Sequence, residues 1–470
     1  MPEFTGTSGA MPPQDVQDSI GRAVVDGMPE TIADLSRLVR IPSVSWDGFD
    51  PDHVVASADA VAELFRGLGV FETVRIERAP KPSGELGQPA VLAKRAARNG
   101  RPTILLYAHH DVQPPGDDAG WDSPPYEPTL RGDRLYGRGT ADDKAGIMTH
   151  VAAIRALVAA TGDPDLGIAC FIEGEEEFGS TSFGAFIAQH RDDLAADAIV
   201  VADSGNWSVD TPAITVGLRG NVTFALTVST LAHASHSGMF GGAVPDAMLA
   251  TVRLLATLWD DAGDVAVAGL ESRAADTPDY AESALRSETG LLDGVSPIGT
   301  GSILARIWDR PSITVTGIDA PSVVNASNTL IPSVTVKISV RVAPGQTSAS
   351  AADAVLAHLR ERAPFGARLE VDQLVTGEPF LVDTAGAAFA TAKAALAAGF
   401  GVEPVEMGVG GSIPFIAELV DVFPEAQILV TGVEDPDSRA HSPNESLHLG
   451  VLRRAIASEA LLLAALDGRA

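Results

Sequence analysis

Residues 103–112, Thr-Ile-Leu-Leu-Tyr-Ala-His-His-Asp-Val, indicate the fold of the chain more clearly than any other segment. The first six of them form a short, largely apolar run, which predicts a strand buried on both faces. His109 and Asp111 follow at the point where that strand ends. In open α/β sheets, ligands gather outside the carboxyl ends of the strands, so these two polar side chains indicate a candidate site.

Several other short apolar runs resemble this one and predict further buried strands. They lie at residues 90–93, 166–172, 197–202 and 427–432. Between them, apolar residues recur at helical spacing, for example at Ile147, Val151, Ile154 and Val158. Strands that alternate with helices predict an α/β domain with a mostly parallel central sheet flanked by helices.

The alternation of buried strands with helices stops near residue 211 and resumes near residue 384. The intervening segment has longer, alternating strand patterns and predicts an α+β unit of its own. The first twenty residues are polar and contain Pro and Gly, which predicts a disordered start. We therefore predict a disordered segment at 1–20, a catalytic domain at 21–211 plus 377–470, and an inserted domain at 212–376.

Composition excludes several classes of protein. Among 470 residues, 33 Lys and Arg stand against 62 Asp and Glu, a net charge of −29 that repels nucleic acids and anionic lipid. Cys170 is the only cysteine, so an intrachain disulfide is impossible. The apolar run at 460–466 is too short to span a membrane. Residues 1–10 lack the basic start and apolar core of a signal peptide, so we expect a cytoplasmic protein.

Carboxylates gather in two further segments. Asp142 and Asp143 lie in Tyr-Gly-Arg-Gly-Thr-Ala-Asp-Asp-Lys-Ala-Gly, residues 136–146, just before a predicted helix. They could simply complement the positive end of that helix. The run Phe-Ile-Glu-Gly-Glu-Glu-Glu-Phe-Gly-Ser, residues 171–180, follows a buried strand directly and holds four glutamates. A solvated acidic turn would explain this run, but clustered carboxylates repel one another unless they are protonated or neutralised by a cation.

The combination of segments is more informative than any single one. Asp203 ends another buried strand, and His441 follows the last strand. Several strands thus deliver Asp, Glu or His near the same edge of the sheet. Two histidines with several carboxylates can form two metal sites that share a bridging carboxylate. Mixed nitrogen and oxygen ligands suit Zn²⁺, Mn²⁺ or Co²⁺.

With these segments in this order, the chain resembles the M20 family of co-catalytic metallopeptidases from about residue 30 to its end. This family includes carnosine-type dipeptidases, acetylornithine deacetylase and succinyl-diaminopimelate desuccinylase. The stretch Arg138-Gly-Thr-Ala-Asp-Asp-Lys and the motif His236-Ser-Gly-Met-Phe-Gly-Gly point to the dipeptidase branch. The resemblance implies a dinuclear-metal, aminopeptidase-like α/β catalytic domain with an inserted α+β lid and dimerisation domain.

The resemblance also implies a role for each residue of the metal site. Two divalent ions per chain are expected, Zn²⁺ first, with Mn²⁺ or Co²⁺ as alternatives. Glu176 is implied as the general base, and Asp111 as the residue that orients His109. A cis peptide is implied between Asp142 and Asp143. The implied metal ligands are His109 and Asp203 for the first ion, Asp142 as the bridge, and Glu177 and His441 for the second ion.

Other residues are implied to contact the substrate. His236 is expected to stabilise the oxyanion, acting from the inserted domain of the partner chain in a homodimer. Arg341 and Ser412 are expected to hold the substrate carboxylate, with Thr329 and Asn325 as weaker candidates. The chain departs from the carnosine-type pattern at Gly408-Val409, where those enzymes tend to carry Arg-Glu. One positive charge is therefore missing.

Three functions remain open from the sequence. The preferred one is a metal-dependent dipeptidase acting on small peptides, without a nucleic-acid or membrane partner. The second is an N-acyl-amino-acid amidohydrolase of the same family, which would use the same metals on an acylated substrate. The third is an inactive metal-binding scaffold, against which the presence of Glu176 and all five ligand positions argues.

Overall fold

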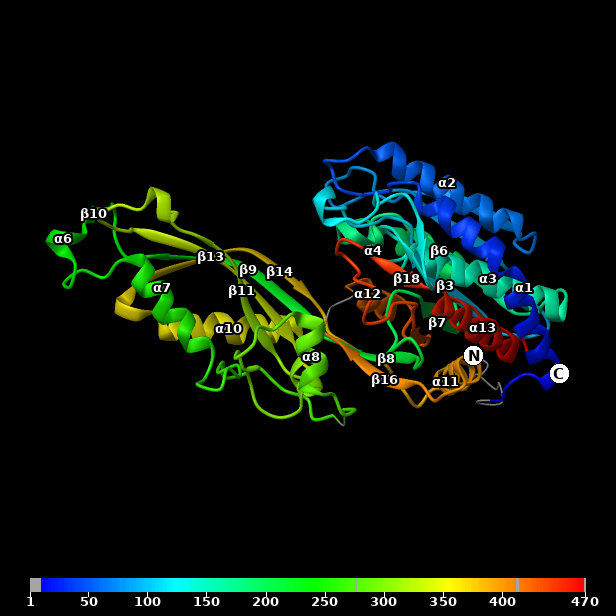
Figure 1. The fold of residues 1–470 in the computed structure, drawn as a ribbon. Coiled ribbons are helices and arrows are strands. Elements are labelled where there is room, and N and C mark those ends of the chain that lie inside the picture. Colours follow the sequence, from blue (N-terminus) through cyan, green and yellow to red (C-terminus); the bar gives the residue numbers. More distant parts are fainter. Residues whose placement is uncertain (1–9, 276, 411–413, 469–470) are drawn as a thin grey trace. The chain divides into compact units, whose positions relative to one another are not determined.

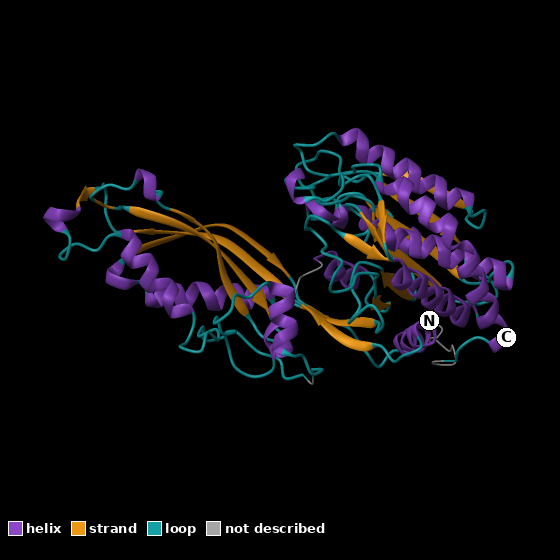
Figure 2. Ribbon diagram, viewed as in Figure 1, coloured by secondary structure: helices purple, strands orange, loops and turns teal. Residues whose placement is uncertain are grey.

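The computed structural model describes residues 10–275, 277–410 and 414–468, without the side chain of residue 414. They form two compact units (Figures 1 and 2). Unit 1 takes residues 1–216, 382–407 and 418–470, and unit 2 takes 217–381 and 408–417. The predicted inserted domain, 212–376, begins and ends five residues before the first segment of unit 2, and residues 408–417, predicted to belong to the catalytic domain, belong to unit 2.

Unit 1 is built on a mixed sheet with the order β1-β2-β6-β3-β7-β17-β8. The pairs β3–β6, β3–β7 and β7–β17 are parallel, whereas the strands toward the edges are antiparallel. All residues of β6 and β7 are buried, because helices cover the sheet as the apolar runs predicted. The strands are β1 (Thr73–Glu77), β2 (Ala90–Arg95), β3 (Thr103–His109), β6 (Gly167–Glu173), β7 (Ala198–Val201), β8 (Ala213–Leu218) and β17 (Gln427–Val430).

The helices of unit 1 pack on this sheet and on one another. Helices α1, α3 and α13 lie side by side, and α11 packs against α13 (Figure 1). Their bounds are α1 (Gln14–Val39), α2 (Pro51–Gly67), α3 (Lys144–Thr161), α4 (Phe183–Gln189), α5 (Arg191–Leu194), α11 (Ala387–Phe400) and α13 (Leu449–Asp467). Three short strands, β4 (Thr129–Arg131), β5 (Arg134–Tyr136) and β18 (Ser446–His448), form a separate antiparallel sheet in the order β18-β5-β4.

Helix α1 corrects the prediction of a disordered segment at 1–20, since residues 14–20 form its first turns. Ile20 is fully buried and Val24 nearly so, and the helix packs against α3 and α13. The polar residues that suggested disorder, such as Asp15 and Asp18, lie on its exposed side. A helix with polar and apolar faces thus replaces the expected coil.

Unit 2 contains an antiparallel sheet in the order β11-β13-β9-β14. Burial alternates along β9 and β13, so one face of the sheet packs on a core while the other is half-exposed. Helices α7 and α10 contact this sheet. The elements are β9 (Gly220–Ser229), β10 (Ser235–His236), α6 (Ser237–Phe240), α7 (Ala247–Leu255), α8 (Glu282–Thr289), α9 (Ile303–Trp308), β11 (Ser312–Asp319), β12 (Thr329–Leu330), β13 (Ser333–Val342), α10 (Ser348–Arg362), β14 (Arg368–Gly377) and β15 (Phe380–Leu381).

Strand β8, strand β16 (Val405–Val409) and helix α12 (Pro414–Val422) contain borders between the units. Over the described residues, every helix is either too short or too polar to cross a lipid bilayer.

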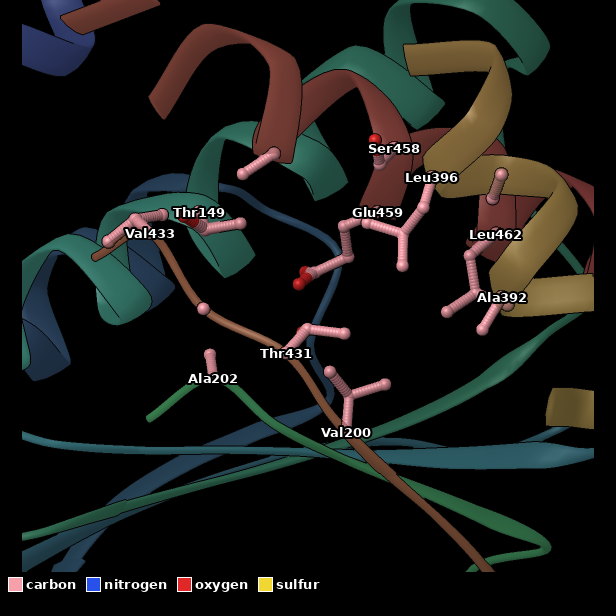
Figure 3. Close-up of a pocket in the computed structure, with 13 residues that line it drawn as sticks. Thr149, Val200, Ala202, Ala392, Leu396, Thr431, Val433, Ser458, Glu459 and Leu462 are labelled. Atoms are coloured by element: carbon pink, nitrogen blue, oxygen red, sulfur yellow. The ribbon is translucent and has the colours of Figure 1, made fainter. Parts of the chain in front are cut away.

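A small cavity of about 30 Å³ lies inside unit 1, between the sheet and helices α3, α11 and α13 (Figure 3). Val200, Leu396 and Thr431 contribute to its mostly apolar wall. The carboxylate of Glu459 extends into this region from α13 and lies 2.8 Å from Nδ1 of the buried His150. The volume suits one or two water molecules rather than a larger ligand.

Candidate metal centre

The carboxyl ends of three neighbouring strands supply most of the candidate site. His109 is the last residue of β3, and Asp203 comes two residues after β7. The turn after β6 forms the short helix η2 (Glu176–Phe178), which carries Glu176 and Glu177. Because β3, β6 and β7 run parallel, their carboxyl ends meet at one edge of the sheet.

Asp142 lies between two histidines from distant parts of the chain. Its Oδ1 is 3.1 Å from Nε2 of His109, and its Oδ2 is 2.9 Å from Nε2 of His441. Each carboxylate oxygen thus faces a different histidine, which is the arrangement that a bridging ligand needs. The peptide bond between Asp142 and Asp143 is cis, as the resemblance implied.

The other predicted ligands complete two groups of side chains around this carboxylate. Oε2 of Glu177 lies 3.3 Å from Nε2 of His441, and Oδ1 of Asp203 lies 3.9 Å from Nε2 of His109. Ligand atoms of His109, Glu176 and Asp203 fall within 4.8 Å of one another, as do those of His109, Asp142 and Glu177. The structure therefore brings all five predicted ligands and Glu176 together, in a mixed donor set that suits first-row divalent ions.

The electrostatics of the cluster also fit a cation. Burial, reinforced by the charge of Asp142, raises the pKa of Glu177 to about 10. Burial raises the pKa of Asp203 to about 6, although His109 opposes the rise. Burial and the negative charge of Asp203 likewise raise the pKa of Glu176 well above its usual value. Carboxylates that resist ionisation for these reasons would be stabilised as anions by a bound cation.

Asp111 connects the histidine of β3 to the acidic turn. It is fully buried, and its carboxylate accepts hydrogen bonds from the backbone N–H groups of Glu176 and Glu177, both at 3.1 Å. The hydroxyl of Ser45 donates to the same carboxylate at 2.7 Å. Oδ1 of Asp111 also lies 3.4 Å from Nδ1 of His109. One side chain can therefore orient both a candidate ligand and the backbone of the candidate base.

Sequence reasoning missed the residue that holds Glu177. The side-chain amide of Gln113 donates to Oε2 of Glu177 at 2.5 Å, and the backbone N–H of Gln113 donates to Oε1 at 3.1 Å. Its position two residues after Asp111, in the same strand-end segment, was the available signal. Arg138 and Glu445 were missed as well, although Arg138 lies inside the quoted segment 136–146 and Glu445 lies four residues after His441.

The predicted substrate residues of unit 2 fall into two places. His236 pairs with Thr329 across the β10–β12 ladder, and Asn325 lies just before β12. His236 is exposed, and its Nδ1 accepts a hydrogen bond from the N–H of Gly238 at 3.0 Å. Ser333 is the first residue of β13, and Arg341 lies eight residues further along the same strand. This separation corresponds to about 26 Å of extended strand.

Arg341 is half-buried, and burial lowers the pKa of its guanidinium. The remaining predicted anchor, Ser412, lies outside the described residues. Within one copy of unit 2, the structure therefore does not bring Arg341 to the end that carries His236, Thr329 and Asn325.

Peptidase family M20/M25/M40 matches residues 105–465. The cysteinylglycine-S-conjugate dipeptidase of Corynebacterium striatum is 36% identical over 351 residues, which cover 74% of this chain and 77% of that protein. The Beta-Ala-His dipeptidase of Homo sapiens is 29% identical, with 86% of this chain and 85% of the relative covered.

Solved structures share the fold over nearly the whole chain. The dipeptidase Dug1p of Saccharomyces cerevisiae has a TM-score of 0.80 at 24% identity and covers 97% of this chain and all of its own. Human carnosine dipeptidase 1 has a TM-score of 0.78 at 24% identity, covering 98% of this chain and all of its own. At these identities the likeness shows the fold, an α/β architecture in which helices cover a mixed sheet whose central strands are parallel.

Proposed function

Because the chain belongs to peptidase family M20/M25/M40, we propose that it is a metal-dependent dipeptidase. The observation that carries the proposal is the position of Asp142, with one carboxylate oxygen beside His109 and the other beside His441. The family relatives named as dipeptidases add support.

In this proposal, two divalent ions occupy the cluster, with Zn²⁺ favoured by the mixed ligands and Mn²⁺ or Co²⁺ as alternatives. His109 and Asp203 would hold one ion, His441 and Glu177 the other, and Asp142 would be shared. Ions held in this way lower the pKa of a bound water and polarise a substrate carbonyl.

Glu176 is the proposed general base. It would take a proton from the attacking water and return it to the amine that leaves when the peptide bond breaks. The backbone N–H of Glu176 donates to Asp111, which supports this role because the bond fixes the backbone of Glu176 beside the candidate metal ligands.

Substrate recognition is assigned to residues of unit 2 and to Ser412. The guanidinium of Arg341, together with Ser412, would bind the free carboxylate of the dipeptide, since a guanidinium fork suits a carboxylate. Thr329 and Asn325 would lie near the oxyanion with His236, which would donate to it.

We further propose that His236 acts on the metal centre of a second chain in a homodimer. The distance along β13 between Arg341 and the end that carries His236 supports this, because a site completed by two chains can use both ends of unit 2. Met239 and Phe240, three and four residues after His236, expose 73% and 46% of their surface, which suits an interface.

A mixed dimer tests the shared site. His236→Ala and Glu176→Gln dimers should each be nearly inactive. In a dimer with one chain of each kind, one site regains both residues and activity should return to a fraction of the wild-type value. If mixed dimers form, as shown by two different affinity tags, and remain inactive, His236 does not act in the partner's site.

Substrate choice tests the function itself. Alanyl-alanine, alanyl-alanine amide and N-acetyl-alanine should be compared on the metal-loaded protein. We expect rapid hydrolysis of the dipeptide, slow hydrolysis of its amide and little reaction of the acylated amino acid. Chelation should abolish turnover, and Zn²⁺ or Mn²⁺ should restore it. Faster turnover of N-acetyl-alanine would favour an amidohydrolase, and absence of any metal-dependent turnover would favour a scaffold.

A further inference from the structure

Arg138 and Glu445 are buried, charged side chains that take no part in the proposed reaction. They connect the loop before Asp142 to the loop after His441. Nη1 of Arg138 lies 2.7 Å from Oε2 of Glu445. Only 1% of the Arg138 side chain and none of the Glu445 side chain is exposed. A buried ion pair of this kind needs further hydrogen bonds to its remaining donors and acceptors to offset the cost of desolvation, and in the described residues Nε of Arg138 makes none.

Glu445 meets that condition by accepting from the backbone around the candidate bridging ligand. Its Oε1 accepts from the N–H groups of Ala141 and Asp142 at 3.0 and 3.2 Å, and its Oε2 accepts from the N–H of Gly139 at 3.1 Å. The carbonyl of Glu445 also accepts from the N–H of Gly137 at 3.0 Å. The carboxylate therefore fixes the backbone that presents Asp142, including the N–H of Asp142 itself.

Arg138 extends the connection to a third loop. Its backbone N–H donates to the carbonyl of Pro125 at 2.7 Å, and its Nη2 donates to the carbonyl of Pro114 at 3.3 Å. Its guanidinium lies 5.5 Å from the ring centroid of Trp121. Pro114 directly follows Gln113, which holds the candidate ligand Glu177.

We infer that Arg138 and Glu445 are positioning residues that set the distance between Asp142 and His441, and thereby the affinity of the metal site that these two ligands share. The inference rests on the proposed function, because it concerns the same centre. Glu445 is four residues after His441, so a shift of its carboxylate moves the His441 loop against the Asp142 loop. Hydrogen-bonding partners that orient ligands typically contribute about 10–100-fold to metal affinity or activity.

Glu445→Gln tests this inference. The variant keeps the shape of the side chain but replaces one carboxylate oxygen with an amide NH₂, which must face the donors of Arg138 and Gly139 or those of Ala141 and Asp142. Titration of the metal-free protein with Zn²⁺ against a competing chelator should show about 10–100-fold weaker binding. With the sites loaded, kcat for alanyl-alanine should fall while KM changes little, because the proposed carboxylate anchors are not altered.

Asp467→Asn is the matched control. Asp467 is also a buried carboxylate that accepts from two backbone N–H groups, those of Asp165 and Leu166, both at 2.7 Å. It lies at the end of α13 beside the start of β6, away from the ligands at the other end of that strand. The control removes a buried negative charge far from the ligands, so it should show no comparable loss of Zn²⁺ affinity.

A double variant adds a second measure. If Arg138 and Glu445 act as one unit, Arg138→Met combined with Glu445→Gln should weaken Zn²⁺ binding no more than the worse single variant. Fully additive losses would contradict a joint role. Should Glu445→Gln fail to fold, Arg138→Lys, which keeps the charge but loses the fork geometry, takes its place in the same titration.

The outcomes separate the two claims. Wild-type protein that binds Zn²⁺ and hydrolyses the dipeptide, combined with unchanged Zn²⁺ affinity in Glu445→Gln, overturns the positioning role alone. Wild-type protein that neither binds Zn²⁺ nor hydrolyses any peptide overturns the proposed function and the positioning role with it. Weaker Zn²⁺ binding in Glu445→Gln but not in Asp467→Asn supports the positioning role.

Discussion

Asp111→Asn should impair both the stability of the protein and the proposed catalysis. The buried carboxylate of Asp111 accepts from Ser45 and from the N–H groups of Glu176 and Glu177, with Nδ1 of His109 also close. Asparagine has one acceptor oxygen in place of two. Whichever way its amide turns, an NH₂ group faces a backbone N–H of the acidic turn.

The size of the effect follows from these contacts. At least one hydrogen bond from a backbone N–H to a charged acceptor is lost, which corresponds to about 1.5–3 kcal/mol of unfolding free energy. The acidic turn and His109 also lose their common partner, so kcat/KM should fall about 10–100-fold, the range for partners that orient metal ligands. Urea unfolding of the metal-free protein and initial rates on alanyl-alanine measure the two quantities separately.

Ser45→Ala is the matched control for this prediction. It removes one donor to Asp111 but leaves the contacts of that carboxylate with the backbone of Glu176 and Glu177 intact. Stability should fall by about 1.5–3 kcal/mol, because this hydrogen bond also ends on the charged carboxylate, but most of the activity should remain. If Asp111→Asn proved as active as Ser45→Ala, Asp111 would not orient the site.

The remaining predictions concern the base, the substrate anchor and a buried pair. Glu176→Gln should lower kcat by at least about 10²–10⁴-fold with unchanged metal content, as a loss of general acid–base catalysis requires. Arg341→Met should weaken dipeptide binding by about 1.5–3 kcal/mol, read as a rise in KM that is absent for the dipeptide amide. Burial alone would lower the pKa of His150, but Glu459 outweighs it and raises that pKa. The pair should therefore contribute stability that is complete below about pH 6.5, the unfolded-state pKa of histidine, and is lost as pH rises through the folded-state pKa. Urea unfolding across this pH range should show the slope in the wild type, and Glu459→Gln should remove it.

The sequence predicted the parts of unit 1 that depend on burial. Strands β3, β6 and β7 are covered on both faces, so they occur in the sequence as continuous apolar runs. Parallel strands bring their carboxyl ends to one edge, which is why the positions of the apolar runs alone predict that His109 and Asp203 lie together. Spacing alone did not decide which residues bind the same metal ion. The family resemblance implied that His109 and Asp203 form one centre with Asp142 and His441.

Elements with weak sequence patterns were missed. Helix α13 is buried on nearly all sides, so it lacks the amphipathic stripe that identifies a surface helix, and only its apolar stretch at 460–466 was noticed. Strand β1 is a half-exposed edge strand with charged residues, and β4, β5 and β18 have three residues each. Such short strands carry too few residues for an alternating pattern to be recognised.

The orienting contacts were also beyond sequence reasoning. Glu445 acts through backbone N–H groups about three hundred positions earlier in the chain, and a backbone donor leaves no mark in the sequence. Gln113 is a single glutamine near Asp111, and its residue type alone does not indicate a partner. Only the folded chain shows that its amide meets Glu177.

Metal stoichiometry tests the central claim, a dinuclear centre shared through Asp142, most directly. Wild-type protein, His441→Ala and Asp142→Ala should each be equilibrated with the same free Zn²⁺ concentration, dialysed, and analysed for metal per chain. A shared carboxylate predicts about two ions for the wild type, about one for His441→Ala, and loss of both for Asp142→Ala. Undiminished metal content in Asp142→Ala would contradict the shared centre.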